Sequence, residues 1–214
     1  MTREAFAAAA SKEDAMMAML HRVPARAGDV FLIPGRLPHA IGPGVFMLEV
    51  QEPTDWVVQP ERFCAGTELM DEDMWGPLEE SVGLDCFDYD GADHWDAIEA
   101  RVRVRPTPVG RGAARLERIV GPCETDCFRI DRLHIERETE FLPGAHHRIG
   151  VVTEGALRLW LEGESFSASA GDSFLLPYAA GTLRLAPEGT AAVVYWVGTN
   201  RRPKLTCVPT QSRA

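Results

Sequence analysis

The side chains best suited to chemistry in this sequence lie close together, with Glu49 ten residues after His39. A histidine can bind a metal ion, but after a proline-containing turn it can also simply hydrogen-bond to the backbone. Glu49 interrupts the apolar segment VFMLEV, where a carboxylate should not be buried without a partner. It therefore faces either a polar cavity or solvent at a sheet edge. Both alternatives remain open from the residues alone.

The residues that lead to His39 resemble a known metal-binding motif. Gly28-DVFLI-Pro34-Gly35-Arg36-Leu37-Pro38-His39 matches the second cupin motif, G-x5-P-x-G-x2-H, except that Arg36 stands at its second glycine. The longer segment 34–55, PGRLPHAIGPGVFMLEVQEPTD, is similar to the ligand-bearing strand of class I mannose-6-phosphate isomerases, and DCFDYDG at 85–91 suits their short bacterial form. The resemblance is specific over about 27–56 and loose over the rest of 20–200.

This resemblance implies a zinc-dependent isomerase that interconverts mannose 6-phosphate and fructose 6-phosphate. The metal would polarise the sugar oxygens while a base moves a proton between C1 and C2. The resemblance implies that His39 binds zinc and that Glu49 is an active-site acid. The family's arginine falls near Gln59, so Arg62, three residues on, is the catalytic candidate for the cationic role. The alternative is a non-catalytic cupin that binds a sugar or sugar phosphate in a regulatory role.

The zinc site is incomplete in this sequence. The family's Gln-x-His pair and following glutamate should precede His39, yet His21 is the only other histidine before it. One histidine and one glutamate do not make a zinc site, which needs three or four protein ligands. We expect either a shortened reading frame or a relative that has lost catalysis.

The second half of the chain offers a weaker metal candidate. His146-His147 lies near where a first cupin motif would sit, but the glutamate expected in that motif falls at Arg148. The position that corresponds to His39 falls at Thr182. We therefore predict that this half is a metal-free cupin, with His146 and His147 in a solvated turn.

An internal repeat indicates that these residues are carried by two related β units. AGDVFLIP at 27–34 and AGDSFLLP at 170–177 share six of eight residues, at an offset of 143. In the C-terminal part, apolar segments with glycine turns follow one another every 8 to 10 residues, and alternation in ALRLWLE at 156–162 is typical of a half-buried strand. Further strands are predicted at 29–34, 44–50 and 54–58. Helices are predicted within 3–20 and around 70–81 and 93–101.

The predicted fold class is all-β, with two cupin-like jelly-roll units, the first of them incomplete. Its parts are a helical segment (1–20), the C-terminal part of a catalytic-type cupin (21–60), an acidic lid with a linker (61–122, the linker being 105–122), a second metal-free cupin-like unit (123–200) and a tail (201–214). An incomplete barrel exposes apolar surface and unpaired edges, so we expect aggregation or a homodimer through that edge.

Composition excludes several other classes of protein. The 214 residues carry a formal net charge of −10, which argues against a nucleic-acid partner. Apolar runs fall well short of the roughly 20 residues that span a membrane, and no export signal is evident.

The five cysteines indicate a reduced, cytoplasmic protein. Cys123 and Cys127 are either half a zinc site or two free thiols in a loop. The expected partner is a small sugar phosphate.

Overall fold

The structure is a computed structural model that describes the chain except residues 13, 53, 55, 65, 91–93, 110–113, 143, 145, 179 and 201–214. The predicted tail, 201–214, lies outside the described residues. The chain divides into two compact units. The first consists of Met1–Leu48 and Thr54–Val104, and the second of Glu49–Pro53 and the chain from Arg105 onward. Each unit has an apolar core of its own.

The first unit is built mainly from short helices: α1 (Arg3–Ala10), α2 (Ala15–Met19), α3 (Asp71–Trp75), α4 (Glu80–Leu84) and α5 (Trp95–Val102). A two-residue pair, β1 (Phe63–Cys64) and β2 (Thr67–Glu68), precedes α3. The core of this unit places Phe6 and Met16 against Met74, Trp75 and Leu84. The three regions predicted to be helical are therefore confirmed, and α1 with α2 shows that the first contains two helices.

The strands predicted within 29–58 do not form among the described residues. Phe31 makes an isolated antiparallel bridge to Arg103, and the other described residues of these segments belong to no strand. Alternating apolar residues form a strand only when a partner pairs with their backbone groups. Here large apolar side chains are exposed instead: Ile41, Val45, Phe46, Met47, Leu48, Trp56 and Val57. A first cupin-like unit at 21–60 is therefore not confirmed.

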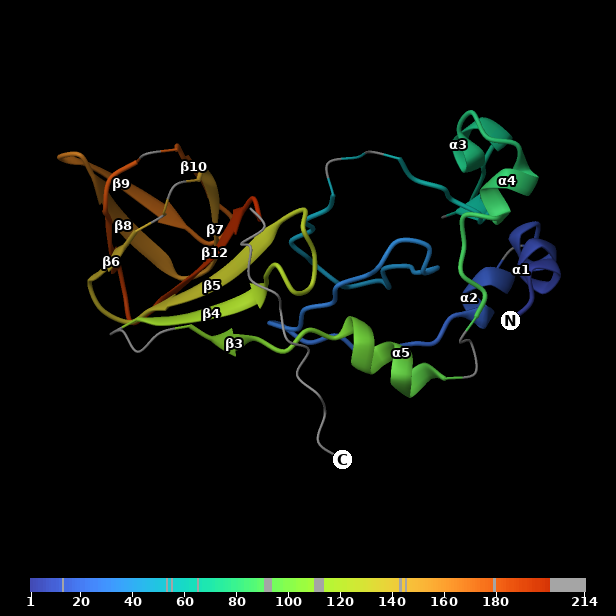
Figure 1. The fold of residues 1–214 in the computed structure, drawn as a ribbon, viewed down its shortest axis with the longest axis horizontal. Helices are drawn as coiled ribbons and strands as arrows, with labels where there is room; N and C mark the ends of the chain where they lie inside the picture. The colour runs from blue at the N-terminus through green and yellow to red at the C-terminus, as the bar shows by residue number, and fades with distance from the viewer. Residues whose placement is uncertain are drawn as a thin grey trace. The chain divides into compact units, whose positions relative to one another are not determined.

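The second unit is an antiparallel β-sandwich. Its strands are β3 (Thr107–Pro108), β4 (Arg115–Val120), β5 (Arg129–Ile135), β6 (Thr139–Phe141), β7 (Arg148–Glu154), β8 (Ala156–Leu161), β9 (Glu164–Ser169), β10 (Ser173–Leu176), β11 (Leu183–Pro187) and β12 (Ala192–Gly198). One sheet has the order β10-β7-β12-β5-β4-β3 and the other β6-β11-β8-β9. Strands β5 to β12 are thus divided between the two sheets in the order of an eight-stranded jelly roll, with β8 and β9 paired as a hairpin in the smaller sheet (Figure 1).

The facing sides of these two sheets enclose the core of the second unit. Leu133, Val152 and Trp196 come from the larger sheet, and Leu157 and Leu185 come from the smaller one. Alternation along each strand produces this division, because side chains two residues apart share a face. The strands predicted between 149 and 198 are confirmed as β7 to β12.

Residues 105–122 differ from their prediction as a linker. They contain β3 and β4, which extend the larger sheet beyond β5. The prolines and glycines of this segment suggested an irregular connection, but they flank the apolar and charged residues of β4 rather than interrupting them. In the described part of the chain, no helix is long and apolar enough to cross a membrane.

Candidate functional site

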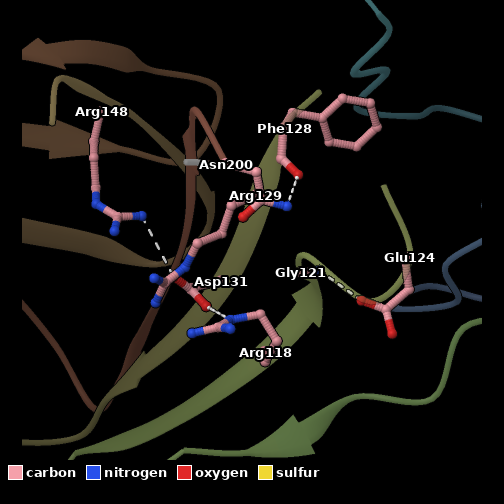
Figure 2. Close-up of polar contacts among 8 residues, drawn as sticks. All are labelled: Arg118, Gly121, Glu124, Phe128, Arg129, Asp131, Arg148 and Asn200. Atoms are coloured by element: carbon pink, nitrogen blue, oxygen red, sulfur yellow. Dashed lines mark hydrogen bonds and ion pairs between the residues drawn. The ribbon is translucent and has the colours of Figure 1, made fainter. Parts of the chain in front are cut away.

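A buried carboxylate at one end of the sandwich interior forms ion pairs with three arginines (Figure 2). Asp131 on β5 is only 1% exposed. Its Oδ1 accepts from Arg118 Nε at 2.5 Å, and its Oδ2 accepts from Arg129 Nε at 2.7 Å and from Arg148 Nη1 at 3.4 Å. We call these four residues the Asp131 cluster. Because they come from β4, β5 and β7, the cluster joins three strands of the larger sheet.

Strand register explains how Arg148 reaches a carboxylate two strands away. On β12, which separates β7 from β5, Gly198 is paired with both Arg148 and Arg129. A Cβ atom on Gly198 would lie 3.5 Å from Arg148 Cγ and 3.6 Å from its Nη1. The arginine side chain therefore passes over the position where any other residue would place a side chain. A Cβ here would be in ordinary van der Waals contact with the arginine, so a side chain larger than alanine would compete with Arg148 for this space.

The cluster lies on the interior face of the sheet. Asp131 is two residues before Leu133, and Arg148 is four before Val152, so each shares a face with a core residue of its own strand. Beside Asp131, Trp196 is fully buried, and its Nε1 has no hydrogen-bond partner among the described residues. A buried donor without a partner costs about 1–3 kcal/mol. The charged Asp131 cluster thus lies beside the neutral Nε1–H donor of Trp196, next to the core.

The cluster carries more positive than negative charge. Three guanidinium groups surround one carboxylate, a formal sum of +2. Burial, followed by the nearby guanidinium of Arg129, lowers the pKa of Arg148, although Asp131 opposes this effect. The side chains of Arg118 and Arg129 remain 25% and 28% exposed. Two cationic groups of the cluster therefore stay accessible to an anion from solvent.

A separate polar network occupies the opposite face of the same sheet. Glu117 Oε2 accepts from Arg132 Nε at 2.8 Å and lies 3.0 Å from His134 Nε2. Arg132 Nη1 also donates to the Tyr195 hydroxyl at 3.2 Å. Hydrogen bonds from His134 and Arg132 outweigh the effect of burial and lower the pKa of Glu117. These residues alternate with core residues along β4, β5 and β12, so they do not contact the interior.

The three site residues predicted from the sequence have separate contacts. His39 is exposed, and its Nδ1 donates to the Leu37 carbonyl at 2.9 Å. Glu49 is exposed as well. Arg62 donates from Nη1 to the Leu69 carbonyl at 3.2 Å and pairs through Nη2 with Asp71 Oδ1. The side-chain contacts described for His39 and Arg62 are thus local ones, although the backbone N–H of Arg62 also donates to the Ala10 carbonyl at 3.0 Å.

The donors around His39 do not fit a zinc site. No group of three or more His, Cys, Asp or Glu side chains that could hold a metal ion occurs among the described residues. His146 is half-buried and His147 exposed beside the start of β7. Cys127 is a free thiol, but Cys123 is disulfide-bonded. The prediction of two free thiols is therefore wrong for Cys123, and a sulfur in a disulfide is not a zinc thiolate.

The solved structures that are similar to this chain and are described here each cover less than half of it. No family model and no curated protein matches the sequence. Among solved structures, a cupin 2 conserved barrel domain protein from Salinispora arenicola is 16% identical, with a TM-score of 0.39 over 44% of this chain and 82% of its own. KdgF from Halomonas sp. is 25% identical, with a TM-score of 0.37 over 46% of this chain and 89% of its own. The EutQ protein of Clostridium difficile is 17% identical, with a TM-score of 0.36 over 45% and 81%.

The second unit has the strand order of a jelly roll. Cupins share this architecture, and the structures similar to this chain include cupin barrels. Within the unit, Arg148 occupies the position where the sequence resemblance expects the glutamate of the first cupin motif. The structure shows that this position points inward. A cation therefore stands where that motif would supply an anionic group.

Sequence reasoning noticed Arg148 only as a missing metal ligand, and it overlooked Arg118, Arg129 and Asp131. One local signal was available. Arg129 and Asp131 are two residues apart in a segment that alternates into Leu133 and Ile135, so all four share one face. A carboxylate in line with two core residues indicates a buried charge that requires cationic partners. The identity of those partners depends on strand register.

Proposed function

We propose that the jelly-roll unit binds a small molecule through an anionic group, with a sugar phosphate as the first candidate. The observation that carries this proposal is the excess of positive charge in the Asp131 cluster. An arginine guanidinium is planar and presents several donors in a fixed arrangement that matches phosphate and carboxylate oxygens. In a partly buried site such contacts are stronger than at an open surface, because less water competes with them.

The cluster is a binding site rather than a complete catalytic centre in this proposal. Both carboxylate oxygens of Asp131 are already engaged by arginines, so neither is available to act as a base. Arg118 and Arg129 would bind the anionic group, and Arg148 would supply buried positive charge behind them. The rest of the ligand would extend toward solvent, where the exposed parts of these two side chains lie.

The isomerase interpretation requires zinc, and the described residues around His39 do not supply its ligands. We therefore derive no reaction step through a metal. The sugar-phosphate specificity itself comes from the resemblance of residues 27–56 to the isomerase family, and it supports the choice of first ligand to test. The binding proposal does not depend on catalysis.

Isothermal titration calorimetry of the full chain tests the proposal. Mannose 6-phosphate should bind with saturation, inorganic phosphate should bind more weakly, and mannose should give no measurable heat. Arg129→Gln should weaken the binding of both anions at least tenfold. The matched control is Arg184→Gln, which removes an exposed arginine that pairs with Glu138 outside the cluster. Equal affinity in wild type and Arg129→Gln, or no saturable binding of either anion, would overturn the proposal.

An enzymatic assay separates binding from catalysis. The full chain should not convert mannose 6-phosphate to fructose 6-phosphate, with or without added zinc. Zinc-dependent turnover that His39→Ala abolishes would show instead that the chain is an isomerase, and that its metal ligands include residues outside those described. Phosphate binding at the Asp131 cluster would then be a separate property.

A further inference from the structure

A cavity opens between the two sheets, and its lining is separate from the Asp131 cluster. It has a volume of about 430 Å³ and is lined mainly by apolar side chains, among them Leu159, Leu161, Phe166, Phe174 and Leu183. This volume lies within the range of about 300–1,000 Å³ that is typical of small-molecule sites. None of the four cluster residues lines it.

Part of the cavity wall belongs to the core of the sandwich. Three of its lining residues, Leu159, Leu176 and Leu183, are almost fully buried and belong to the apolar core. At the mouth, Phe166 is 54% exposed although it faces inward on β9, opposite Leu159. An inward-facing aromatic side chain left half in water indicates that the sandwich is not closed at this point.

The sheet edges explain why the opening exists. Within the described part of the chain, β9 is the last strand of the smaller sheet and β10 is the last strand of the larger one. The chain passes from one sheet to the other through residues 170–172, which close one end of the gap. Apolar side chains from both sheets line the space between these two edge strands.

Charge at the mouth restricts what can enter. Asp172 is the one charged residue in the lining, and its Oδ2 accepts from the Ser169 backbone N–H at 2.8 Å and from its hydroxyl at 3.0 Å. These two hydrogen bonds lower the pKa of Asp172, so it stays anionic at neutral pH. An anion entering beside it would be repelled, whereas an uncharged apolar molecule would remove the exposed ring of Phe166 from water.

We propose that this cavity between β9 and β10 binds a small, uncharged aromatic or alicyclic molecule. The core leucines in the lining favour a small molecule over an added strand, because a strand pairs along an edge and leaves those residues uncovered. This site is independent of the Asp131 cluster. The cluster selects anions, and the cavity selects uncharged apolar compounds.

The neutral fluorescent probe N-phenyl-1-naphthylamine tests the cavity in the full chain. Its emission should rise on binding, saturate at one probe per chain, and be insensitive to added phosphate and to salt. Phe166→Lys places a charge at the mouth and should weaken probe binding at least tenfold. The matched control, Leu142→Lys, changes a leucine that is 72% exposed and lies outside the cavity lining, and it should leave binding unchanged.

A milder variant keeps the test valid if Phe166→Lys does not fold, as judged by circular dichroism. Phe166→Ser removes the ring without adding charge, and it should still weaken the probe several-fold. The proposal is overturned if the probe shows no saturable signal, or if both variants bind it as wild type does. It is also overturned if size-exclusion chromatography with light scattering shows a dimer that Phe166→Lys dissociates, because a second copy would then occupy the opening.

Discussion

Replacing Asp131 by asparagine tests the structural role of the buried cluster most directly. The variant keeps the size of the side chain but leaves three guanidinium groups without their carboxylate. Removing one partner of a buried ion pair typically costs about 3–5 kcal/mol. Arg118 and Arg129 keep partial contact with water, with side chains 25% and 28% exposed, which reduces the penalty. We therefore expect the free energy of unfolding of the sandwich to fall by about 3 kcal/mol.

Urea unfolding of the full chain, followed by far-ultraviolet circular dichroism, measures this loss. With a slope near 2 kcal/mol per molar urea, the midpoint of the β transition should fall by roughly 1.5 M. Glu164→Gln is the control, because it neutralises an exposed carboxylate on β9, and its effect should stay within about 0.5 kcal/mol. A loss below about 1 kcal/mol in Asp131→Asn would refute the reasoning that the carboxylate balances the three arginines.

The stabilisation by phosphate is a second measurement on the Asp131→Asn variant. A ligand present at 100 times its dissociation constant raises the free energy of unfolding by about 2.7 kcal/mol. Because Asp131→Asn raises the formal charge of the cluster from +2 to +3, phosphate should restore more stability to it than to wild type. An equal response in Asp131→Asn and Glu164→Gln would show that the cluster holds the strands together but does not bind the anion.

Three further substitutions follow from the same structure. Gly198→Leu should displace the side chain of Arg148, weaken phosphate binding at least tenfold by calorimetry and lower the free energy of unfolding by about 1–3 kcal/mol. Gly155→Ala should cost at least about 2 kcal/mol in the same urea assay, because φ is +71° and the added Cβ would lie 2.2 Å from a backbone oxygen. Glu117 has a lowered pKa in the folded state, so its stabilisation is present above its ordinary pKa of 4.5 and is lost as the pH falls through the folded value. Glu117→Gln should therefore lower the urea midpoint at pH 7 and approach wild type in acid; an equal loss at both pH values would contradict the assigned ion pairing.

The C-terminal half was predictable because its local signals agree with its tertiary structure. The strands from β7 to β12 are short and mostly rich in apolar residues, some of them alternate with polar ones, and glycine turns separate several of the strands. In β8, Leu157 and Leu159 are buried whereas Arg158 between them is exposed, as the alternation predicts. Pattern and packing point to the same face, so the positions of the strands could be predicted without any knowledge of their partners.

The internal repeat shows that local sequence signals predict the turn but not the strand that follows it. In both copies the aspartate accepts a hydrogen bond from a backbone N–H three residues earlier, at 3.0 Å for Asp29 and 2.8 Å for Asp172. The local turn is therefore the same in the two places. After the second copy, β10 pairs along its whole length with β7, whereas after the first copy only Phe31 forms a bridge. The turn is encoded locally, but the strand needs a partner.

The metal motif illustrates the same limit for a functional site. Arg36 replaces the motif's second glycine, yet it takes the left-handed conformation that favours glycine, with φ at +73°. The backbone of the motif thus persists although its residue has changed. His39 follows in an exposed position, bound to its own segment through the Leu37 carbonyl. A motif predicts local geometry well, but it predicts a metal site only when other segments bring the remaining ligands.

The Asp131 cluster depends on register that no local pattern contains. Arg148 is 17 residues from Asp131 in sequence and two strands away in the sheet. Gly198 is aligned between the two, and a shift of β12 by one residue would place the half-buried side chain of Val197 in that path instead. Charge inversion at the motif's glutamate and a glycine on the intervening strand are separate features of the sequence. Together they place the guanidinium of Arg148 inside the sandwich within reach of Asp131.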